Sequence, residues 1–315
     1  MCIRDSLNSV NNSRNYTFCK GDICDYELLR QKIFDFKPDF IVHFAAESHV
    51  DNSILNPNSF IKTNVNGTLN LLNICYDFWM KSPFNYKPKF KNARYHQIST
   101  DEVYGSIEKG SFDEYSRYNP SSPYSSSKAA AALLIKSWQK TYNFPSIIIH
   151  PTNNYGPWQF PEKLIPVVIT RAYKSKSIPI YGDGDYTRDW LYVKDHAIAI
   201  DLILHKGKNH ETNNIGGFND YKNIDLVRLL CKQMDEKLGR SSGSSEKLIK
   251  FVKDRPGHDF RYAIDASNIN KEFYLSCLVD RKTSKIAFIS SVQGGMDIEE
   301  TAIKTPEKII TTKVN

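Results

Sequence analysis

Short apolar runs recur along this chain of 315 residues, separated by longer amphipathic stretches. Continuous apolar runs of this length are typical of strands that are buried on both faces of a parallel sheet. On this pattern we expect strands at Tyr16 to Cys19, Asp39 to Phe44, Arg94 to Ser99, Ser146 to His150 and Trp190 to Val193.

The stretches between these runs have helical periodicity and helical composition. They predict a turn at Gly21 to Asp25 that leads into a helix through about Phe36. Further helices are predicted over Pro57 to Met80, residues 121–142, Leu164 to Tyr173, Asp195 to Leu204 and Ile224 to Met234. Such alternation of strand and helix predicts an α/β fold with a doubly wound parallel sheet. Gly216-Gly217, the last of these helices and the flexible segment SSGSS at 241–245 are expected to form a smaller C-terminal lobe.

The composition excludes several classes of protein. At 40% hydrophobic residues the chain can bury a substantial core, and its length suits one or two domains. No apolar run approaches the roughly 20 residues of a membrane span, and the first residues lack the apolar core of a signal peptide, so we expect no membrane contact and a cytoplasmic location. The six cysteines form no CxxC pair, so we expect neither a metal site nor disulfides.

Acidic side chains follow the expected strand that ends at Ser99. Thr100, Asp101 and Glu102 would emerge at its carboxyl end, which is where ligands bind in open α/β sheets. Acidic residues after a strand also cap helices, so the position alone leaves both interpretations open.

Tyr124 and Lys128 are four residues apart at the start of a segment rich in Ala and Leu. On a helix they share one face, and a cation beside a phenol lowers the pKa of the phenol, which makes Tyr124 a candidate base. The spacing also occurs by chance: Tyr16 and Lys20 have it too, but in a segment of strand character where residues four apart lie about 13 Å apart.

The two groups together carry a resemblance. Ser-Thr-Asp-Glu-Val-Tyr-Gly at 99–105, followed by Tyr-Ser-Ser-Ser-Lys at 124–128, resembles the extended short-chain dehydrogenases/reductases that modify nucleotide sugars. Among them the chain is most similar to the dTDP-glucose 4,6-dehydratase family, because Asp and Glu adjoin the Thr. The resemblance implies NAD as cofactor, dTDP-glucose as substrate, and a homodimer of the intact enzyme in which helices 57–80 and 121–142 form the contact. An anionic sugar nucleotide, rather than a nucleic acid, would then account for the net charge of +7, since Lys and Arg are scattered along the sequence.

The resemblance extends over residues 7 to 272 and implies further site residues. Those matching cofactor contacts, besides Tyr124 and Lys128, are Asp22, Ile23, Phe44, Ala45, Ala46, Glu47, Ser48, Thr63 and Asn153. Those matching substrate contacts, besides Ser48 and Thr100, are Asn154, Lys163, Leu164, Ile165, Pro166, Pro179, Tyr181, Arg188, Asn223, Asp254, Arg255, Pro256, Gly257 and His258. Guanidinium groups suit phosphate oxygens, which independently favours a diphosphate near the two arginines.

The resemblance also implies a division of chemical roles. NAD would oxidise C4 of the hexose and so acidify the C5 proton, with Tyr124, assisted by Lys128, taking the hydroxyl proton and Thr100 orienting that hydroxyl. Glu102 would take the C5 proton and Asp101 would protonate the departing C6 hydroxyl. These two roles need opposite protonation states, which adjacent carboxyls in a closed site can adopt.

The amino-terminal part departs from this family. The sequence contains neither GxxGxxG nor GxGxxG, the turn that brings backbone N–H groups to a pyrophosphate. We therefore expect a Rossmann-like sheet that lacks its first βαβ segment, weak NAD binding and an inactive fragment. Residues 1–6 match nothing in the family, and we interpret them as a non-native scar.

The carboxyl-terminal part departs as well. Residues 271–310 resemble part of the ATP-grasp β subunit of succinate–CoA ligase, with a junction near Lys271 to Tyr274. The alternative is a divergent C-terminal hairpin and helix of the same enzyme. The expected organisation is a scar at 1–6, a partial NAD-binding domain with the catalytic residues at 7–160, substrate-lobe elements interleaved with the last sheet strands at 161–272, and a foreign tail at 273–315.

Other functions remain open on the sequence alone. Within the same superfamily the chain could be a nucleotide-sugar epimerase or decarboxylase, which a product assay would separate from a dehydratase. From other classes, it could be a non-catalytic chimeric remnant, favoured by the absent glycine turn, or a ligase fragment, favoured only by the tail.

Overall fold

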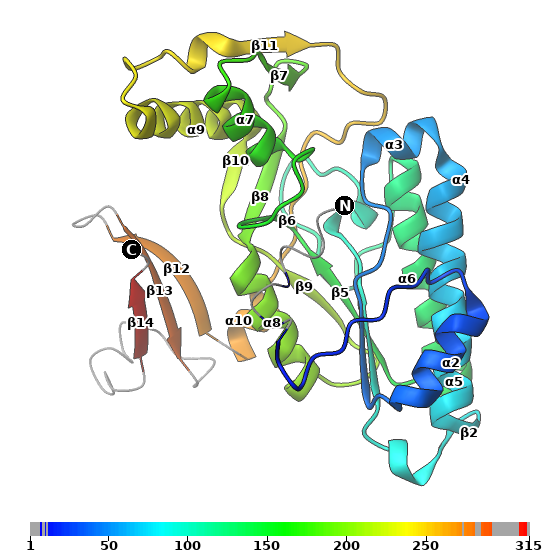
Figure 1. Ribbon diagram of the computed structural model, residues 1–315. Coiled ribbons are helices and arrows are strands. Elements are labelled where there is room, and N and C mark those ends of the chain that lie inside the picture. Colours follow the sequence, from blue (N-terminus) through cyan, green and yellow to red (C-terminus); the bar gives the residue numbers. More distant parts are fainter. Residues whose placement is uncertain are drawn as a thin grey trace.

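A parallel sheet forms the centre of the molecule (Figure 1). The computed structural model describes residues 7, 10, 12–272, 274–280, 285–291 and 309–313, so the expected scar at 1–6 lies outside the described residues. The sheet has four strands in the order β1 (Phe40–His43), β4 (Arg94–Ile98), β5 (Ser146–Pro151) and β9 (Thr212–Ile215), all parallel. The expected α/β fold with a parallel sheet is therefore confirmed.

Helices cover both faces of this sheet. On one face α2 (Tyr26–Phe36), α5 (Thr68–Trp79) and α6 (Pro123–Tyr142) enclose the largest apolar cluster. On the other face α8 (Val193–Lys206) encloses a second cluster against the same strands (Figure 1). The apolar run Ile147 to Ile149 of β5 is continuous because the strand is buried between these two layers. β4 is buried from Tyr95 to Ile98 as well, although its sequence RYHQI includes polar side chains.

The expected helix 57–80 forms with a different winding in its middle. After α3 (Val50–Leu55), it begins as α4 (Pro57–Phe60), widens into the π-helical segment η1 (Ile61–Gly67) and ends as α5. The π-helical turn carries Asn64, whose amide bonds both backbone groups of Glu47, at 2.8 and 3.0 Å, and donates to the Ser127 hydroxyl at 2.8 Å. It thereby ties the loop after β1 to α6.

Helix α6 has strong signals at both ends. Ser122 caps its amino end in a capping box with Ser125, and Pro123 occupies the first turn. At the other end Asn143 adopts a left-handed conformation with φ of 56°. These signals fix where the helix starts, and therefore where Tyr124 stands relative to β4.

A smaller lobe is built from two further layers. Helices α7 (Leu164–Tyr173) and α9 (Asn223–Leu238) pack together around a third apolar cluster, next to the parallel pair β7 (Ile178–Tyr181) and β11 (Ile249–Val252). A three-stranded sheet in the order β10 (Asp220–Lys222), β8 (Thr187–Tyr192) and β6 (Asn153–Tyr155) connects it with the main body. The remaining short elements are β2 (Met80–Ser82), β3 (Asn85–Tyr86), η2 (Pro88–Phe90), η3 (Asp101–Tyr104), η4 (Glu246–Leu248) and α10 (Ser267–Glu272).

Two expectations about elements were wrong, and one strand was missed. Tyr16 to Cys19 is not a strand: these residues are mostly exposed and pair with none of the described strands. The expected strand at Trp190 to Val193 is confirmed as the end of β8 up to Tyr192, in the small sheet, whereas Val193 begins α8. The strand β9 beside β5 was missed, because its sequence TNNI has no apolar run. The segment at 241–245 is anchored rather than flexible, since the buried Ser245 bonds the Asp235 carboxylate through both its backbone N–H and its hydroxyl, the latter at 2.6 Å.

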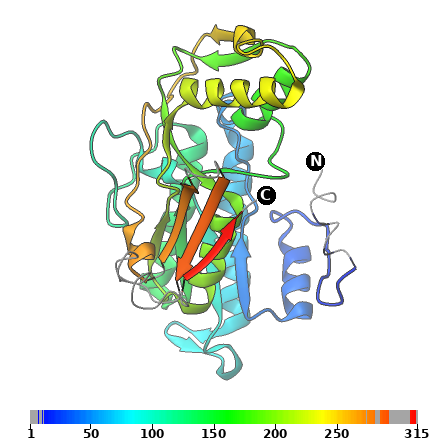
Figure 2. The ribbon, with the colours of Figure 1, turned by 90° about the vertical axis from the view of Figure 1, so that its left-hand side faces the viewer.

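The last described strands form a separate antiparallel sheet. Its order is β12 (Tyr274–Asp280), β13 (Lys285–Ser291) and β14 (Ile309–Lys313), and in the described residues they pair only with one another. Figure 2, which views the molecule from the side of α8, has this sheet in front of the body. The proposed domain boundary at 273 stays a prediction.

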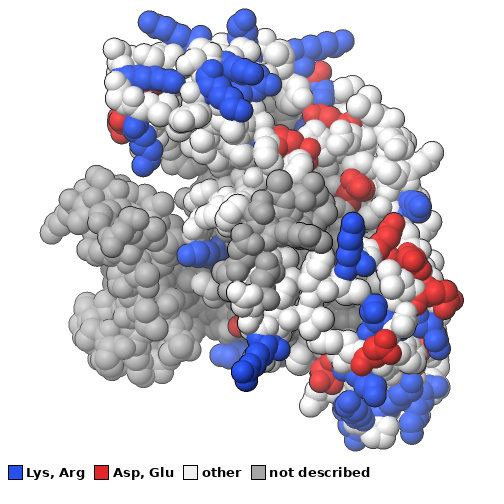
Figure 3. Space-filling view, in the orientation of Figure 1, with Lys and Arg blue, Asp and Glu red and all other residues white. Residues whose placement is uncertain are grey.

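Folding gathers basic residues that are scattered along the sequence. The segments 164–181 and 223–253, which form the smaller lobe, contain ten Lys and Arg against four Asp and Glu. Figure 3 shows these side chains gathered over α7, α9 and β11. Among the described residues, no helix is long and apolar enough to cross a membrane.

Candidate active site

The end of β4 positions three of the predicted catalytic residues. Thr100 follows the strand and caps η3, its hydroxyl accepting the Glu102 N–H at 3.3 Å. The same hydroxyl donates to Oδ1 of Asp101 at 3.2 Å. Asp101 is only 3% exposed, and its Oδ2 has no hydrogen-bond partner in the described part of the chain.

The two adjacent carboxyls, Asp101 and Glu102, differ in the charges around them, and therefore in how strongly each one holds a proton. Burial raises the pKa of Asp101 to about 8, and the charge of Glu102 adds to the effect. Burial also raises the pKa of Glu102, but the cations Arg188, Arg255 and Lys163 oppose that rise. At neutral pH Asp101 therefore holds a proton that it can donate, whereas Glu102 is closer to a cluster of positive charges that favours its carboxylate.

Tyr124 and Lys128 lie at the amino end of α6, facing the end of β4. The ammonium of Lys128 is buried and donates to the Ile98 carbonyl at 2.6 Å, and burial lowers its pKa to about 8. The expected lowering of the Tyr124 pKa is wrong for this arrangement. Burial raises that pKa well above the usual value, and the charges of Glu102 and Asp101 raise it further.

A buried pair behind Thr100 was not predicted. His150, at the end of β5, bonds the Thr100 carbonyl through Nδ1 at 3.1 Å, and its Nε2 bonds the Tyr118 hydroxyl at 2.9 Å. Burial lowers the pKa of His150 to about 3, so the ring is neutral. With Nδ1–H donating to the carbonyl, Nε2 accepts from the tyrosine, which fixes the backbone at Thr100. The only sequence signal was a histidine at a strand end.

A cavity of about 400 Å³ opens beside Glu102, between the parallel sheet and the smaller lobe. It brings together predicted residues that are up to 210 positions apart in the chain, from Ser48 to His258. They come from the loop after β1, from α7, β7, β8 and α9, and from the loop that contains Arg255 and His258. The predicted residues that line it are Ser48, Glu102, Asn153, Lys163, Leu164, Pro179, Tyr181, Arg188, Asn223, Arg255 and His258.

Arg255 and Lys163 supply positive charge to this cavity. Arg255 lies 3.5 Å from Oδ1 of Asp51, and its Nε is buried without a partner in the described residues. Tyr181 donates to the other oxygen of Asp51 at 2.9 Å. Lys163 donates to the Ser48 carbonyl at 3.0 Å. Asp51 was not predicted from the sequence.

Arg188 has a different environment from the one expected. Its guanidinium donates to the carbonyls of Thr187, Asp259 and Phe260 and lies over the ring of Tyr262, 4.1 Å from the ring centre. Most of its N–H groups are therefore occupied by the protein. Tyr262, also missed, donates to Asp259 at 3.0 Å and lies 3.3 Å from Oε2 of Glu102.

His258 is held by two partners. Its Nδ1 lies 2.7 Å from the Asp254 carboxylate, and the ring stacks on Tyr186 with 3.8 Å between the ring centres. Tyr186 donates to the same carboxylate. Gly257 is required nearby, since its φ is 65° and a Cβ would lie 2.7 Å from the Ser121 carbonyl.

The other predicted residues do not line this cavity. Phe44 to Glu47 form the exposed loop after β1, and Thr63 lies on η1. Asp22 accepts the Cys24 N–H at 2.9 Å, and Ile23 packs against the α2 and α5 core. The remaining predicted residues are also outside the lining: Thr100, Asp101, Tyr124, Lys128, Asn154, Ile165, Pro166, Asp254, Pro256 and Gly257. In the described part of the chain no group of three or more His, Cys, Asp and Glu could hold a metal ion.

Comparison with known proteins identifies two families of sequence. A family model described as GDP-mannose 4,6 dehydratase matches residues 3–275, and one described as ATP-grasp domain matches residues 248–315. The probable dTDP-glucose 4,6-dehydratase of Sinorhizobium fredii is 48% identical over 268 residues, covering 85% of this chain and 75% of that protein. The dTDP-glucose 4,6-dehydratase of Salmonella typhimurium is 46% identical over 278 residues, covering 85% and 76%.

Solved structures agree with these relatives. DesIV, the dTDP-glucose 4,6-dehydratase of Streptomyces venezuelae with NAD and TYD bound, superposes with a TM-score of 0.76 at 39% identity, covering 85% of this chain and 77% of that chain. The dTDP-glucose 4,6-dehydratase of Bacillus anthracis in complex with NAD gives a TM-score of 0.70 at 41% identity, with coverage of 84% and 76%.

Proposed function

Because the chain belongs to the dTDP-glucose 4,6-dehydratase family of NAD-dependent epimerases and dehydratases, we propose that its site is built to remove water from the hexose of dTDP-glucose. The observation that carries this proposal is the pair Asp101 and Glu102. One carboxyl keeps its proton near neutral pH, and its neighbour faces three cations, which is the division that an elimination by acid and base requires.

The residues divide the work as follows. NAD, when bound, would accept a hydride from C4 of the sugar, which makes the C5 proton acidic, and would return that hydride to C6 once water has left, so that the cofactor is regenerated. Glu102 takes the C5 proton and gives it back to C5 when C6 is reduced, and Asp101 donates its own proton to the departing C6 hydroxyl. Thr100, fixed from behind by His150, orients the C4 hydroxyl.

Tyr124 has to change its state to act as a base. In the described arrangement it is a phenol with a raised pKa, because it is buried beside two carboxyls. Lys128 donates to the Ile98 carbonyl instead of to the phenol oxygen. The proposed role of the pair therefore requires the ammonium of Lys128 to approach Tyr124 when the site is filled.

The cavity supports a nucleoside diphosphate sugar as ligand. Arg255 and Lys163 face it with positive charge, and the orphaned Nε of Arg255 is a donor that a phosphate oxygen would satisfy. His258, whose ring stacks on Tyr186, also lines the cavity. Asn223 adds a buried amide oxygen that has no partner in the described residues.

The described residues fit one end of NAD. The buried Oδ1 of Asn153 lacks a described partner, and Asn153 lines the cavity together with Ser48 of the loop after β1 and with Glu102, which suits the end of the cofactor that reacts. For the pyrophosphate the printed sequence offers no glycine-rich turn, and among the described strands β1 pairs only with β4. We therefore propose that this chain by itself binds NAD weakly and turns over little or no substrate.

Binding experiments separate these claims. Calorimetric titration of the chain with dTDP should give saturable binding, and Arg255→Gln should weaken it at least tenfold, whereas Lys174→Gln, an exposed lysine of the same lobe, should leave it unchanged. Absence of dTDP binding, or binding indifferent to Arg255, refutes the assignment of the cavity. Saturable NAD binding in the micromolar range would refute the proposal that this chain binds NAD weakly.

A product assay then tests the reaction itself. At saturating NAD, any turnover of dTDP-glucose should release one water, detected by mass spectrometry, and Asp101→Asn and Glu102→Gln should each abolish it. A product with retained mass would indicate an epimerase, and loss of carbon dioxide from a uronic acid sugar would indicate a decarboxylase.

We also propose that the intact enzyme is a homodimer through the helical face opposite α8. Leu133 of α6 is 56% exposed and Ile61 of η1 is 47% exposed, although both are large apolar side chains on helices. Sedimentation analysis should give a dimer that Leu133→Lys converts to a monomer.

For residues 273–315 we propose a tail without ligase activity of its own, and saturable ATP binding would contradict this.

A further inference from the structure

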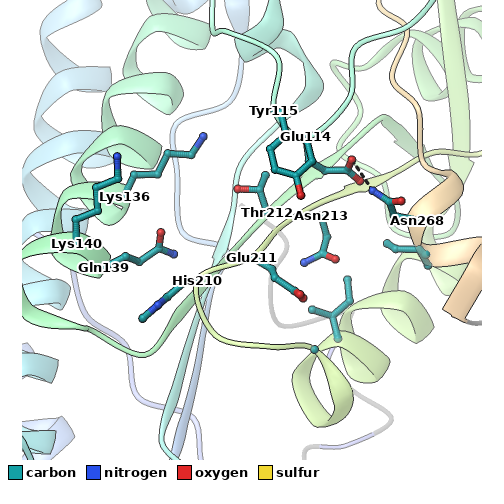
Figure 4. A pocket seen from close by; sticks show the side chains of 13 residues that line it. Glu114, Tyr115, Lys136, Gln139, Lys140, His210, Glu211, Thr212, Asn213 and Asn268 are labelled. Atoms are coloured by element: carbon teal, nitrogen blue, oxygen red, sulfur yellow. Dashed lines mark hydrogen bonds between the residues drawn. The ribbon is translucent and has the colours of Figure 1, made fainter. Parts of the chain in front are cut away.

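A second cavity, of about 610 Å³, lies away from the candidate active site, toward the amino ends of β5 and β9. Its walls come from the second half of α6, the loop around Glu114, the end of α8, the residues that lead into β9, and α10. Figure 4 shows its side chains. Nothing in the proposed dehydratase chemistry uses these residues.

The acidic groups of this cavity already have partners. Glu114 is buried, and its two carboxylate oxygens accept the Asn214 N–H at 3.3 Å and the Asn268 amide at 2.8 Å. Glu211 accepts the Lys208 N–H at 3.2 Å and lies 3.9 Å from the Lys208 ammonium. Neither acid forms an ion pair with the lysines on the opposite wall, since in the described residues neither carboxylate lies within 4.0 Å of the Lys136 or Lys140 ammonium.

The basic groups lack such partners. Lys136 and Lys140 lie one turn apart on α6, and within the described residues neither has a carboxylate within 4.0 Å. The Lys136 ammonium lies 4.5 Å from the ring centre of Tyr118, where it gains only the attraction of the ring face. Burial and the charge of Lys140 both lower the pKa of Lys136. A partly desolvated cation beside a like charge is unfavourable unless an anion compensates it.

The neutral polar groups add to the excess of donors. Nδ2 of Asn213 is buried and has no partner in the described part of the chain. His210 and Gln139 have already committed a nitrogen each, to the carbonyls of Phe144 and Ser146, both at 3.1 Å. In Figure 4 the lysines stand on one side, Glu114 with Asn268 on the other, and Asn213 between them. In the described part of the chain, the cavity therefore has one buried amide donor without a partner and two ammonium groups that belong to no ion pair.

We propose that this cavity binds a small organic anion through a carboxylate or phosphate group. Lys136 and Lys140 compensate its charge, and the free amide of Asn213 donates to one of its oxygens. Tyr115, one of the residues that line the cavity, is 90% exposed, so the cavity is accessible from solvent on this side. This site is independent of the proposed function, since Lys136 is eight residues beyond Lys128 on α6, about 12 Å along the helix.

Calorimetric titrations with citrate, inorganic phosphate and glucose 1-phosphate test the proposal, each against sodium chloride at equal ionic strength. We expect saturable binding to one site for at least one of them. Binding of citrate alone assigns a carboxylate ligand, and binding of the two phosphates alone assigns a phosphate ligand. Lys136→Gln and Lys140→Gln should each weaken binding at least fivefold, the double variant should abolish it, and Asn213→Ala should weaken it.

Controls keep the outcome decisive. Lys136→Arg retains the charge and should retain binding, which separates loss of the cation from loss of folding, and circular dichroism checks each variant. Arg255→Gln, in the first cavity, should leave this binding unchanged. Binding that persists in the Lys136→Gln, Lys140→Gln double variant, disappears in Arg255→Gln, or is matched by chloride overturns the proposal.

Discussion

Replacement of Asp101 by Asn should remove a pH dependence from the stability of the protein. The folded state raises the pKa of this carboxyl from 3.8 to about 8. Between these values the unfolded chain has lost the proton and the folded chain retains it, so the folded state binds more protons and becomes less stable as pH rises. Asn at this position has no proton to lose, so the stability of Asp101→Asn should not fall with rising pH for this reason.

The size of the effect follows from the shift. One pKa unit corresponds to about 1.4 kcal/mol, so over the interval from about pH 6 to about pH 7.5 the wild type should lose about 2 kcal/mol relative to Asp101→Asn. Buried histidines such as His43 and His150, whose pKa values are lowered, act in the opposite direction. They are present in both proteins and cancel in the difference.

Urea denaturation followed by tryptophan fluorescence measures this difference at each pH. Asp113→Asn is the matched control: Asp113 is exposed and its pKa is lowered, so this variant should follow the wild type throughout the interval. A difference between wild type and Asp101→Asn that stays constant across the interval would refute the reasoning, because Asp101 would then be ionised in the folded state as well.

Three further predictions concern packing and charge. Gly217→Ala should lower the free energy of unfolding by about 3 kcal/mol or more, because a Cβ would lie 2.2 Å from the Trp190 carbonyl oxygen. Gly239→Ala is the control: it has open space around it and should lower the free energy of unfolding by about 1 kcal/mol. Equal urea midpoints for the two variants would contradict the clash at Gly217. Ser245→Ala should destabilise by about 1 to 3 kcal/mol in the same assay, because it leaves the buried Asp235 with one donor fewer; a change near zero would mean that water replaces the hydroxyl. The affinity for dTDP, measured by calorimetry, should fall as sodium chloride is added, because the smaller lobe carries ten basic against four acidic residues; an affinity independent of salt would exclude a contribution from this field.

The elements with a strong hydrophobic pattern were predictable. The expected helix Leu164 to Tyr173 agrees with α7 at both ends, and the expected strands agree with β4 and β5 within one residue. For β5 the signal was the apolar run Ile147 to Ile149, which burial between two helical layers favours. The strand β9 was missed because TNNI has no such run and forms only by pairing with β5. Conversely, YTFC at 16–19 has the composition of a strand but no described partner.

The site was predictable where its residues are close in sequence. Asp101 and Glu102 are adjacent, and Tyr124 and Lys128 share a helix face, so local spacing was informative. Partners from distant segments give no such signal: Arg255 meets Asp51 across 204 positions, and Tyr262 reaches Glu102 across 160. The direction of the Lys128 ammonium also depends on a tertiary contact, the Ile98 carbonyl, which spacing on a helix does not specify.

The π-helical segment η1 constrains the number of residues that its helix can contain. A π-helical turn accommodates an extra residue relative to an α-helical one, so the two halves of this helix are out of phase by about 100° with respect to a regular α-helix. Deleting one residue between Ile61 and Gly67 would let the segment rewind regularly. The apolar face of α5 could then stay in the core only if Asn64 rotated away from Glu47 and Ser127. A change in residue count would therefore uncouple the loop after β1 from α6.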